Sequence, residues 1–115
     1  MPPASAARRQ VRELLDRAAV CRADNDYARA IKLSHQAEAS ARGANEPALK
    51  ALTWFALGYY LMEGEGFHRE VMPPETYLKG AAQLIEGSAG VDPILSRNIA
   101  RMVARFDRRA GKGAP

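Results

Sequence analysis

Cysteine is nearly absent from this sequence, since Cys21 is the only one among 115 residues. A single thiol excludes an intramolecular disulfide and any metal site built from several cysteines. Because Cys21 lies within a helical pattern of apolar residues, we interpret it as a small buried hydrophobic residue. The sequence also has no Gly-rich phosphate loop, no nucleophile elbow and no histidine–cysteine pair. These absences predict a protein that is not an enzyme and holds no cofactor.

Apolar stretches long enough to cross a membrane are also missing. The most apolar segment, Ala51–Met62, has 12 residues, whereas a transmembrane helix needs about 20. The first residues, MPPASAARRQ, carry charge without a following apolar run, so we expect no signal peptide. A cytoplasmic protein without membrane contact is therefore expected.

Strand signals are absent too, because no stretch alternates polar and apolar residues as a half-buried β-strand does. Apolar residues instead recur every three or four positions, which predicts an all-α chain of antiparallel helical hairpins. Five helices are expected, over about 8–21, Tyr27–Arg42, about 46–63, Pro74–Glu86 and Pro93–Arg109. We expect one domain over 8–109, with flexible ends at 1–7 and 110–115.

Local signals mark several of the helix ends. Asp26 and Asn45 are suitable N-caps, and Gly43 is a suitable C-terminal stop. The strongest signal is Asp92 followed by Pro93, because a carboxylate cap and a proline at the first helical position both favour a helix start.

Positive charge is confined to the C-terminal part of the chain. From residue 93 onward there are six basic residues and one acidic residue, which gives +5. Residues 1–92 have 11 basic and 12 acidic residues, which gives −1. The net charge of +4 therefore comes from the last predicted helix and the tail.

The segment Ala51–Met62 is central to the expected fold. It holds four of the eight aromatic residues, and Thr53 is its only clearly polar side chain. A helix that is apolar nearly all round must be covered on both sides. We therefore predict a central helix with other helices packed around it.

Part of the chain resembles a tetratricopeptide repeat. The spacing Trp54-x2-Leu57-Gly58-x2-Leu61 follows the W-x2-L-G-x2-Y signature of the first helix of a repeat, with leucine in place of tyrosine. Residues at 25–31, together with Ala37, resemble the turn and second helix of another repeat. The resemblance covers about Val11–Ile85 as two degenerate repeats, with the last helix as a closing helix.

This resemblance implies a right-handed mini-solenoid in which Trp54 fills the gap between paired helices and Gly58 allows close approach. Leu14 and Trp54 are 40 residues apart, more than the usual repeat of about 34. Two repeats are also fewer than the three or so that a free-standing solenoid needs. The extra helix or a homodimer would supply the missing cover. A three-helix bundle of the microtubule-interacting-and-trafficking kind shares the Tyr27/Ala30 pattern but has no place for the Trp54 helix.

In the repeat family, the first helices line a concave groove that binds extended or helical peptides. The matching positions here are Arg12, Leu15, Ala19, Arg22, Phe55, Tyr59, Met62 and Glu63. Leu15 and Ala19 replace the basic and amide pair of members that bind a terminal carboxylate, so an apolar groove is implied instead. The alternative is that Phe55, Tyr59 and Met62 are core residues beneath the fifth helix.

Two charged segments complete the set of candidate sites. Glu63, Glu65, His68 and Glu70 could bind a divalent metal, but their loop lacks a ligand motif, and we interpret it as a solvated loop without a metal. On the last helix, Arg97, Arg101, Arg105 and Arg108 could bind an anion, because arginine offers forked donors to phosphate and carboxylate. The alternative is a solvated outer face.

The sequence predicts a protein–protein interaction module, either an adaptor or a secretion-type chaperone, which binds a peptide or helix of another protein. The alternative is a nucleic-acid-binding or regulatory accessory protein that uses the Arg-rich last helix. Salt dependence separates the two, because phosphate binding weakens steeply with salt.

Overall fold

The computed structural model describes residues 3–44, 46–64, 73–87 and 91–111. Within these ranges the chain forms helices and no strands, as predicted. The helices are α1 (Pro3–Ala23), α2 (Tyr27–Arg42), α3 (Pro47–Glu63), α4 (Pro74–Glu86) and α5 (Pro93–Gly111). The prediction of an all-α chain with five helices is confirmed for the described residues.

Three helix boundaries differ from the sequence prediction. Helix α1 begins at Pro3, within the segment expected to be flexible, because proline suits a first helical position and alanines favour its continuation. Helix α5 continues to Gly111. The N-cap of α3 is Glu46 and not Asn45, since Pro47 occupies the first helical position, and Glu46 makes no side-chain cap. Asn45 itself lies outside the described residues.

The turn between α1 and α2 follows the predicted chemistry. The Asp26 carboxylate accepts a hydrogen bond from the backbone N–H of Arg29 at 3.1 Å, as an N-cap does. Asn25 has a φ of 62°, a left-handed conformation that asparagine tolerates better than most residues. At the start of α5, the Asp92 carboxylate accepts from the N–H of Ile94 at 2.8 Å. These two caps mark the starts of α2 and α5.

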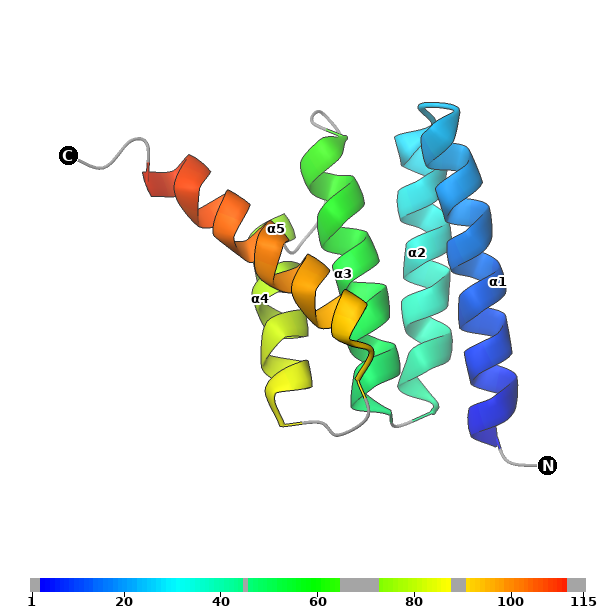
Figure 1. Ribbon diagram of the computed structural model, residues 1–115. Helices are drawn as coiled ribbons and strands as arrows, with labels where there is room; N and C mark the ends of the chain where they lie inside the picture. Colours follow the sequence, from blue (N-terminus) through cyan, green and yellow to red (C-terminus); the bar gives the residue numbers. More distant parts are fainter. Residues whose placement is uncertain (1–2, 45, 65–72, 88–90, 112–115) are drawn as a thin grey trace.

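The helices are stacked in the order of the chain. Figure 1 shows α1, α2 and α3 side by side, with α5 running obliquely across α3 and α4. Each helix contacts the next one, and contacts also join α1 to α3 and α3 to α5. The C-terminal end of α5 extends beyond the other helices (Figure 1). The contact between α1 and α3 brings together the two helices expected to line a groove.

Helices α3 and α4 interlock through two glycines. A Cβ atom on Gly58 of α3 would lie 2.6 Å from Leu78 Cγ of α4, so only glycine leaves room for the leucine. Conversely, a Cβ atom on Gly80 of α4 would lie 2.2 Å from Cζ3 of Trp54 on α3. Each helix thus accepts a large side chain of the other at a glycine. The close approach predicted at Gly58 is observed.

Helix α3 is covered on two sides, as its composition requires. One core cluster joins it to α1 and α2 and includes Val11, Leu14, Ile31, Leu57 and Leu61. On the other side, α4 and α5 contribute Ala81, Ile99, Leu78 and Met102 to two further clusters. Cys21 is only half-buried at the edge of the first cluster, and not fully buried as expected. It lies near the C-terminal end of α1, which ends at Ala23.

Candidate functional site

A groove runs along the surface between α1 and α3, and an ion pair joins the two helices at each end. At one end, Arg8 Nη2 of α1 lies 2.9 Å from Glu46 Oε1, just before α3. At the other end, Arg22 Nη2 lies 3.2 Å from Glu63 Oε2, at the last residue of α3. Early α1 therefore lies beside early α3, and late α1 beside late α3, which makes the two helices parallel.

The middle of the groove is apolar. Its narrower part has a volume of about 310 Å³ and is lined by Leu15, Ala19, Arg22, Leu52, Phe55, Ala56, Tyr59 and Tyr60. Its wider part has a volume of about 970 Å³ and extends to the start of α5. Leu15 and Leu52 line both parts, so the two form one continuous groove.

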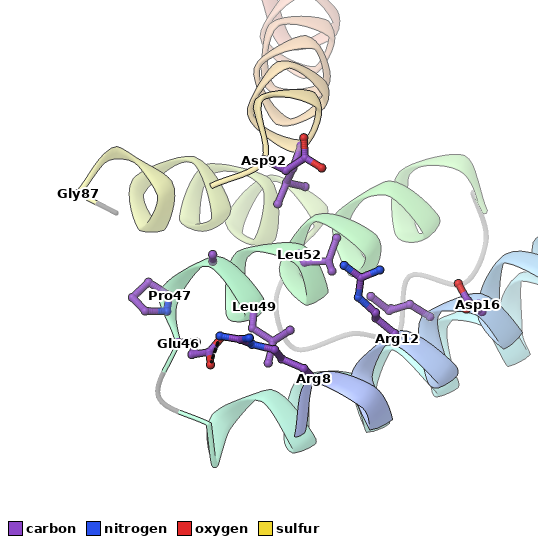
Figure 2. A pocket seen from close by; sticks show the side chains of 12 residues that line it. Arg8, Arg12, Asp16, Glu46, Pro47, Leu49, Leu52, Gly87 and Asp92 are labelled. Atoms are coloured by element: carbon purple, nitrogen blue, oxygen red, sulfur yellow. Dashed lines mark hydrogen bonds and ion pairs between the residues drawn. The ribbon is translucent and has the colours of Figure 1, made fainter. Parts of the chain in front are cut away.

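The wider part combines apolar and charged groups. Figure 2 shows Arg8 and Glu46 pointing toward each other on one side, with Asp92 at the start of α5. Leu49 and Leu52 of α3 lie between these charged residues (Figure 2). Arg12 is exposed on α1. The groove thus offers apolar contact area in its centre and polar groups at its rim.

Most of the predicted groove residues lie where the resemblance implies. Arg12, Leu15, Arg22, Phe55 and Tyr59 all line the groove, and so does Ala19. Phe55 and Tyr59 are half-buried, because each also packs against the core. Glu63 lies at the end of the groove, where it binds Arg22.

Met62 is the exception among the predicted partner-binding residues. It is only 6 % exposed and packs with Leu78 of α4 and Met102 of α5. Helices α4 and α5 cover the side of α3 on which Met62 lies. For Met62, the core interpretation is therefore the correct one.

A polar network holds the aromatic wall at the Arg22 end. The Tyr27 hydroxyl donates to Glu63 Oε2 at 3.0 Å, and Arg22 Nη2 donates to the Tyr59 hydroxyl oxygen at 3.0 Å. The Arg22 guanidinium carbon also lies 5.4 Å from the centroid of the Tyr59 ring. Tyr59 is thus fixed by a hydrogen bond and a cation–π contact.

The electrostatics of this network favour an ionised Glu63. Burial alone would raise the pKa of its carboxyl group, but hydrogen bonds from Tyr59, Tyr27 and Arg22 outweigh burial and lower the pKa. The pKa of Tyr59 is raised, first by burial and then by the neighbouring Glu63 carboxylate. At neutral pH, the end of the groove therefore holds a carboxylate that accepts hydrogen bonds from Arg22 and from the Tyr27 hydroxyl.

Several groove residues were not predicted from the sequence. Leu52 and Ala56 lie on the same face of α3 as Phe55 and Tyr59, and the helical spacing could have identified them. Leu49 lies one turn earlier on the same helix. Glu46 and Leu95 could not have been identified, because they reach the groove only through the packing of separate helices.

A second surface feature is the row of arginines on α5, which we call the Arg face: Arg97, Arg101, Arg105 and Arg108. All four residues are exposed. Asp107, the only acidic residue of α5, lies 3.5 Å from Lys79 Nζ of α4. Within the described part of the chain, no ion pair or hydrogen bond joins an acidic side chain to the Arg face.

The predicted acidic loop falls largely outside the structure. Glu65, His68 and Glu70 are not among the described residues, so the structure does not test the interpretation of this loop. No group of three potential ligands that could hold a metal occurs among the residues described. His35, the other histidine, is half-buried with its ring edge-on to Tyr77 at a centroid distance of 6.3 Å.

Comparison of the chain with protein-family models, with curated proteins and with solved structures finds no match. None of the helices described here is both long and apolar enough to cross a membrane. The chemistry of the groove and of the Arg face is therefore the basis for inferring function.

Proposed function

We propose that this chain is a tetratricopeptide-like interaction domain that binds a short apolar segment of another protein in the groove between α1 and α3. The observation that carries the proposal is the apolar floor between two ion pairs. Leu15, Ala19 and Leu52 form this floor together with the aromatic rings of Phe55 and Tyr59. The binding role is non-enzymatic, and we propose the cytoplasm as its compartment.

The length of the groove suits a peptide. Arg8 and Arg22 mark its two ends and are 14 residues apart on α1, which corresponds to about 21 Å along a helix. About six extended residues cover that distance at ~3.3 Å each, and so does a helix of three to four turns. Aromatic residues beside small ones form pockets for apolar anchors. A segment with two or three apolar side chains therefore matches the groove.

The contacts that α3 makes with its neighbours support the same proposal. Trp54 and Gly58, the two signature residues of α3, both contribute to its interlocking with α4. Contact between α1 and α3 is the contact expected between first helices of successive repeats. Helix α5 covers the outer side of α3 and α4, and we propose that it closes a right-handed mini-solenoid that lacks a third repeat. An adaptor or a secretion-type chaperone would use such a groove.

Blocking the groove floor tests this proposal. Ala19 is exposed and lines the groove, so Ala19→Arg fills the groove without disturbing the core. Ala39 is an exposed alanine on α2 that does not line the groove, and Ala39→Arg is the matched control. Peptides selected from a random 12-residue display library against the wild type provide the probes.

We expect enriched peptides to carry two or three apolar residues and to bind Ala19→Arg at least about tenfold more weakly, a loss of about 1.4 kcal/mol. Ala39→Arg should bind them as the wild type does. Selection of no peptide, or equal binding to both variants, would overturn the proposal. Affinity should change little between low and high salt, because apolar contacts dominate.

A further inference from the structure

The Arg face forms a straight row of like charges. Arg101, Arg105 and Arg108 follow Arg97 by 4, 8 and 11 positions, so all four lie within about 80° around the helix axis. They extend over ~16 Å along α5. Because these residues are exposed, one ligand could contact all four guanidinium groups together.

This positive charge is not neutralised within the described part of the protein. Arg8, Arg22 and Arg42 on the other helices each pair with a glutamate. On α5, by contrast, Asp107 is held by Lys79, which also binds Glu75 at 2.8 Å. Among the described residues, no acidic side chain therefore competes with an outside anion for the Arg face.

The residues between the arginines indicate which kind of anion fits. Ala100 and Ala104 are exposed between them, so small side chains separate the guanidinium groups. The large apolar residues exposed in the described structure are Val20 on α1 and Ile94, which lies one turn before Arg97 on the same side of α5 and not between the arginines. A protein partner would need apolar or aromatic anchors within the face. Single-stranded nucleic acid would need aromatic rings for base stacking. Among the residues described between its first and last arginine, the face thus offers forked donors for phosphate and no exposed large apolar side chain.

We propose that the Arg face of α5 binds the phosphate backbone of double-stranded nucleic acid. Each guanidinium group donates hydrogen bonds to phosphate oxygens, for which its planar fork is suited. A helix is 10–12 Å across with its side chains, and the major groove of DNA is ~12 Å wide, so α5 can lie in or along that groove. The C-terminal end of α5 extends beyond the other helices, which leaves it accessible to a duplex (Figure 1). This inference does not depend on the proposed peptide groove.

The number of arginines sets the expected salt dependence. Each phosphate neutralised on a DNA duplex contributes ~0.9 to the slope of log affinity against log salt concentration. Four contacts give a slope of about −3.6, which corresponds to a loss of affinity on the order of 10²-fold between 50 and 200 mM salt. Binding should be largely independent of sequence, because the proposed contacts are with phosphate oxygens, which are the same at every base pair.

The test measures fluorescence anisotropy of a labelled 20-base-pair duplex with the full chain at several salt concentrations. The variant replaces all four residues of the Arg face by glutamine, which keeps helix propensity. The matched control replaces Arg9, Arg17, Arg29 and Lys32, which are exposed on α1 and α2, by glutamine and so has the same net charge. Circular dichroism confirms that both variants remain helical. A third variant with four Arg→Lys changes keeps the charge without the forked donors.

We expect the Arg-face variant to lose at least tenfold in duplex affinity and most of the salt slope, whereas the control stays within about twofold. The Arg→Lys variant should keep most of the salt slope. Parallel titrations with duplex DNA and duplex RNA identify which duplex is preferred, and binding of either supports the proposal.

Four results would overturn the proposal of duplex binding. They are no duplex binding at 50 mM salt, equal losses of duplex affinity in the Arg-face variant and the control, equal affinity for the separated single strands, and tighter binding of a polyglutamate peptide than of either duplex. The last result would assign the face to an acidic protein.

Discussion

The contact between Trp54 and Gly80 allows a direct test of the packing of α3 on α4. A methyl group added to Gly80 would lie 2.2 Å from Cζ3 of Trp54 and 2.5 Å from its Cε3, whereas carbon atoms in contact are normally 3.5–4.0 Å apart. Tyr77 packs edge-on against the indole ring at a centroid distance of 5.9 Å, and Lys50 Nζ lies 5.0 Å from the ring centroid. Gly80→Ala must therefore displace a ring that is held by two neighbours, or separate the helices.

The magnitude follows from two opposing effects. Overpacking of a core costs about 1–3 kcal/mol, and a contact this short belongs at the upper end of that range. Replacing glycine by alanine inside a helix stabilises it by about 1 kcal/mol. We therefore expect Gly80→Ala to lower the free energy of unfolding by ~2 kcal/mol. In a chain of this size, that loss lowers the melting temperature by about 8 °C.

Urea titration followed by circular dichroism measures this loss, and Gly87→Ala is the control. Gly87 has no atom within 4 Å of an added Cβ, so its substitution should change the free energy of unfolding by less than about 0.5 kcal/mol. Trp54→Leu should reduce the cost of Gly80→Ala in a double-mutant cycle, because the smaller side chain vacates the space. A Gly80→Ala variant as stable as the wild type would refute this account of the interface.

Two further predictions concern the groove. Tyr59→Ala should weaken binding of a selected peptide at least about tenfold, as loss of an aromatic anchor does. Its free energy of unfolding should fall by only about 2 kcal/mol, because Tyr59 is half-buried. Unchanged peptide affinity in a titration would contradict the proposal that the groove binds the peptide. The lowered pKa of Glu63 means that its stabilising contribution is complete above the pKa of the unfolded carboxyl group and is lost as pH falls through the lower folded pKa. The difference in urea midpoint between wild type and Glu63→Gln should therefore shrink as the pH is lowered from neutral through the folded pKa of Glu63. A constant difference would show that Glu63 does not contribute through its charge.

The sequence predicts the helices well because their signals are local. Asp26 and Asp92 cap the helices that follow them, and each makes its hydrogen bond within three residues. The signature residues Trp54 and Gly58 also predict close packing with a partner helix. The sequence predicts the start of α3 one residue too early. Asparagine is a better N-cap residue than glutamate, which favours Asn45, but Pro47 occupies the first helical position and makes Glu46 the N-cap. Such errors are small, since each is confined to one helix end.

The groove is less predictable, because α3 is apolar nearly all round. On α1, the spacing of Leu15 and Ala19 separates the groove side from the core side. On α3, the spacing of apolar residues does not distinguish Tyr59 from Met62. Tyr59 lines the groove, whereas Met62 lies beneath α5. Only the path of the chain after α3 decides between them. The ion pair between Arg8 and Glu46 joins residues 38 positions apart, so no local pattern could have indicated it.

Binding to the groove and binding to the Arg face depend on different forces, so the two activities can be measured separately on one molecule. Peptide binding in the groove buries apolar surface and should be nearly insensitive to salt, whereas duplex binding releases counterions and should weaken steeply as the salt concentration rises.

The two surfaces share α5, because Leu95 at its start lines the groove and Arg97 follows within the same turn. A peptide that contacts Leu95 therefore restrains the helix that carries the arginines. If bound peptide changes the affinity for a duplex, the duplex must change the affinity for the peptide by the same factor. Equal affinities with and without the second ligand would show that α5 serves the two surfaces independently.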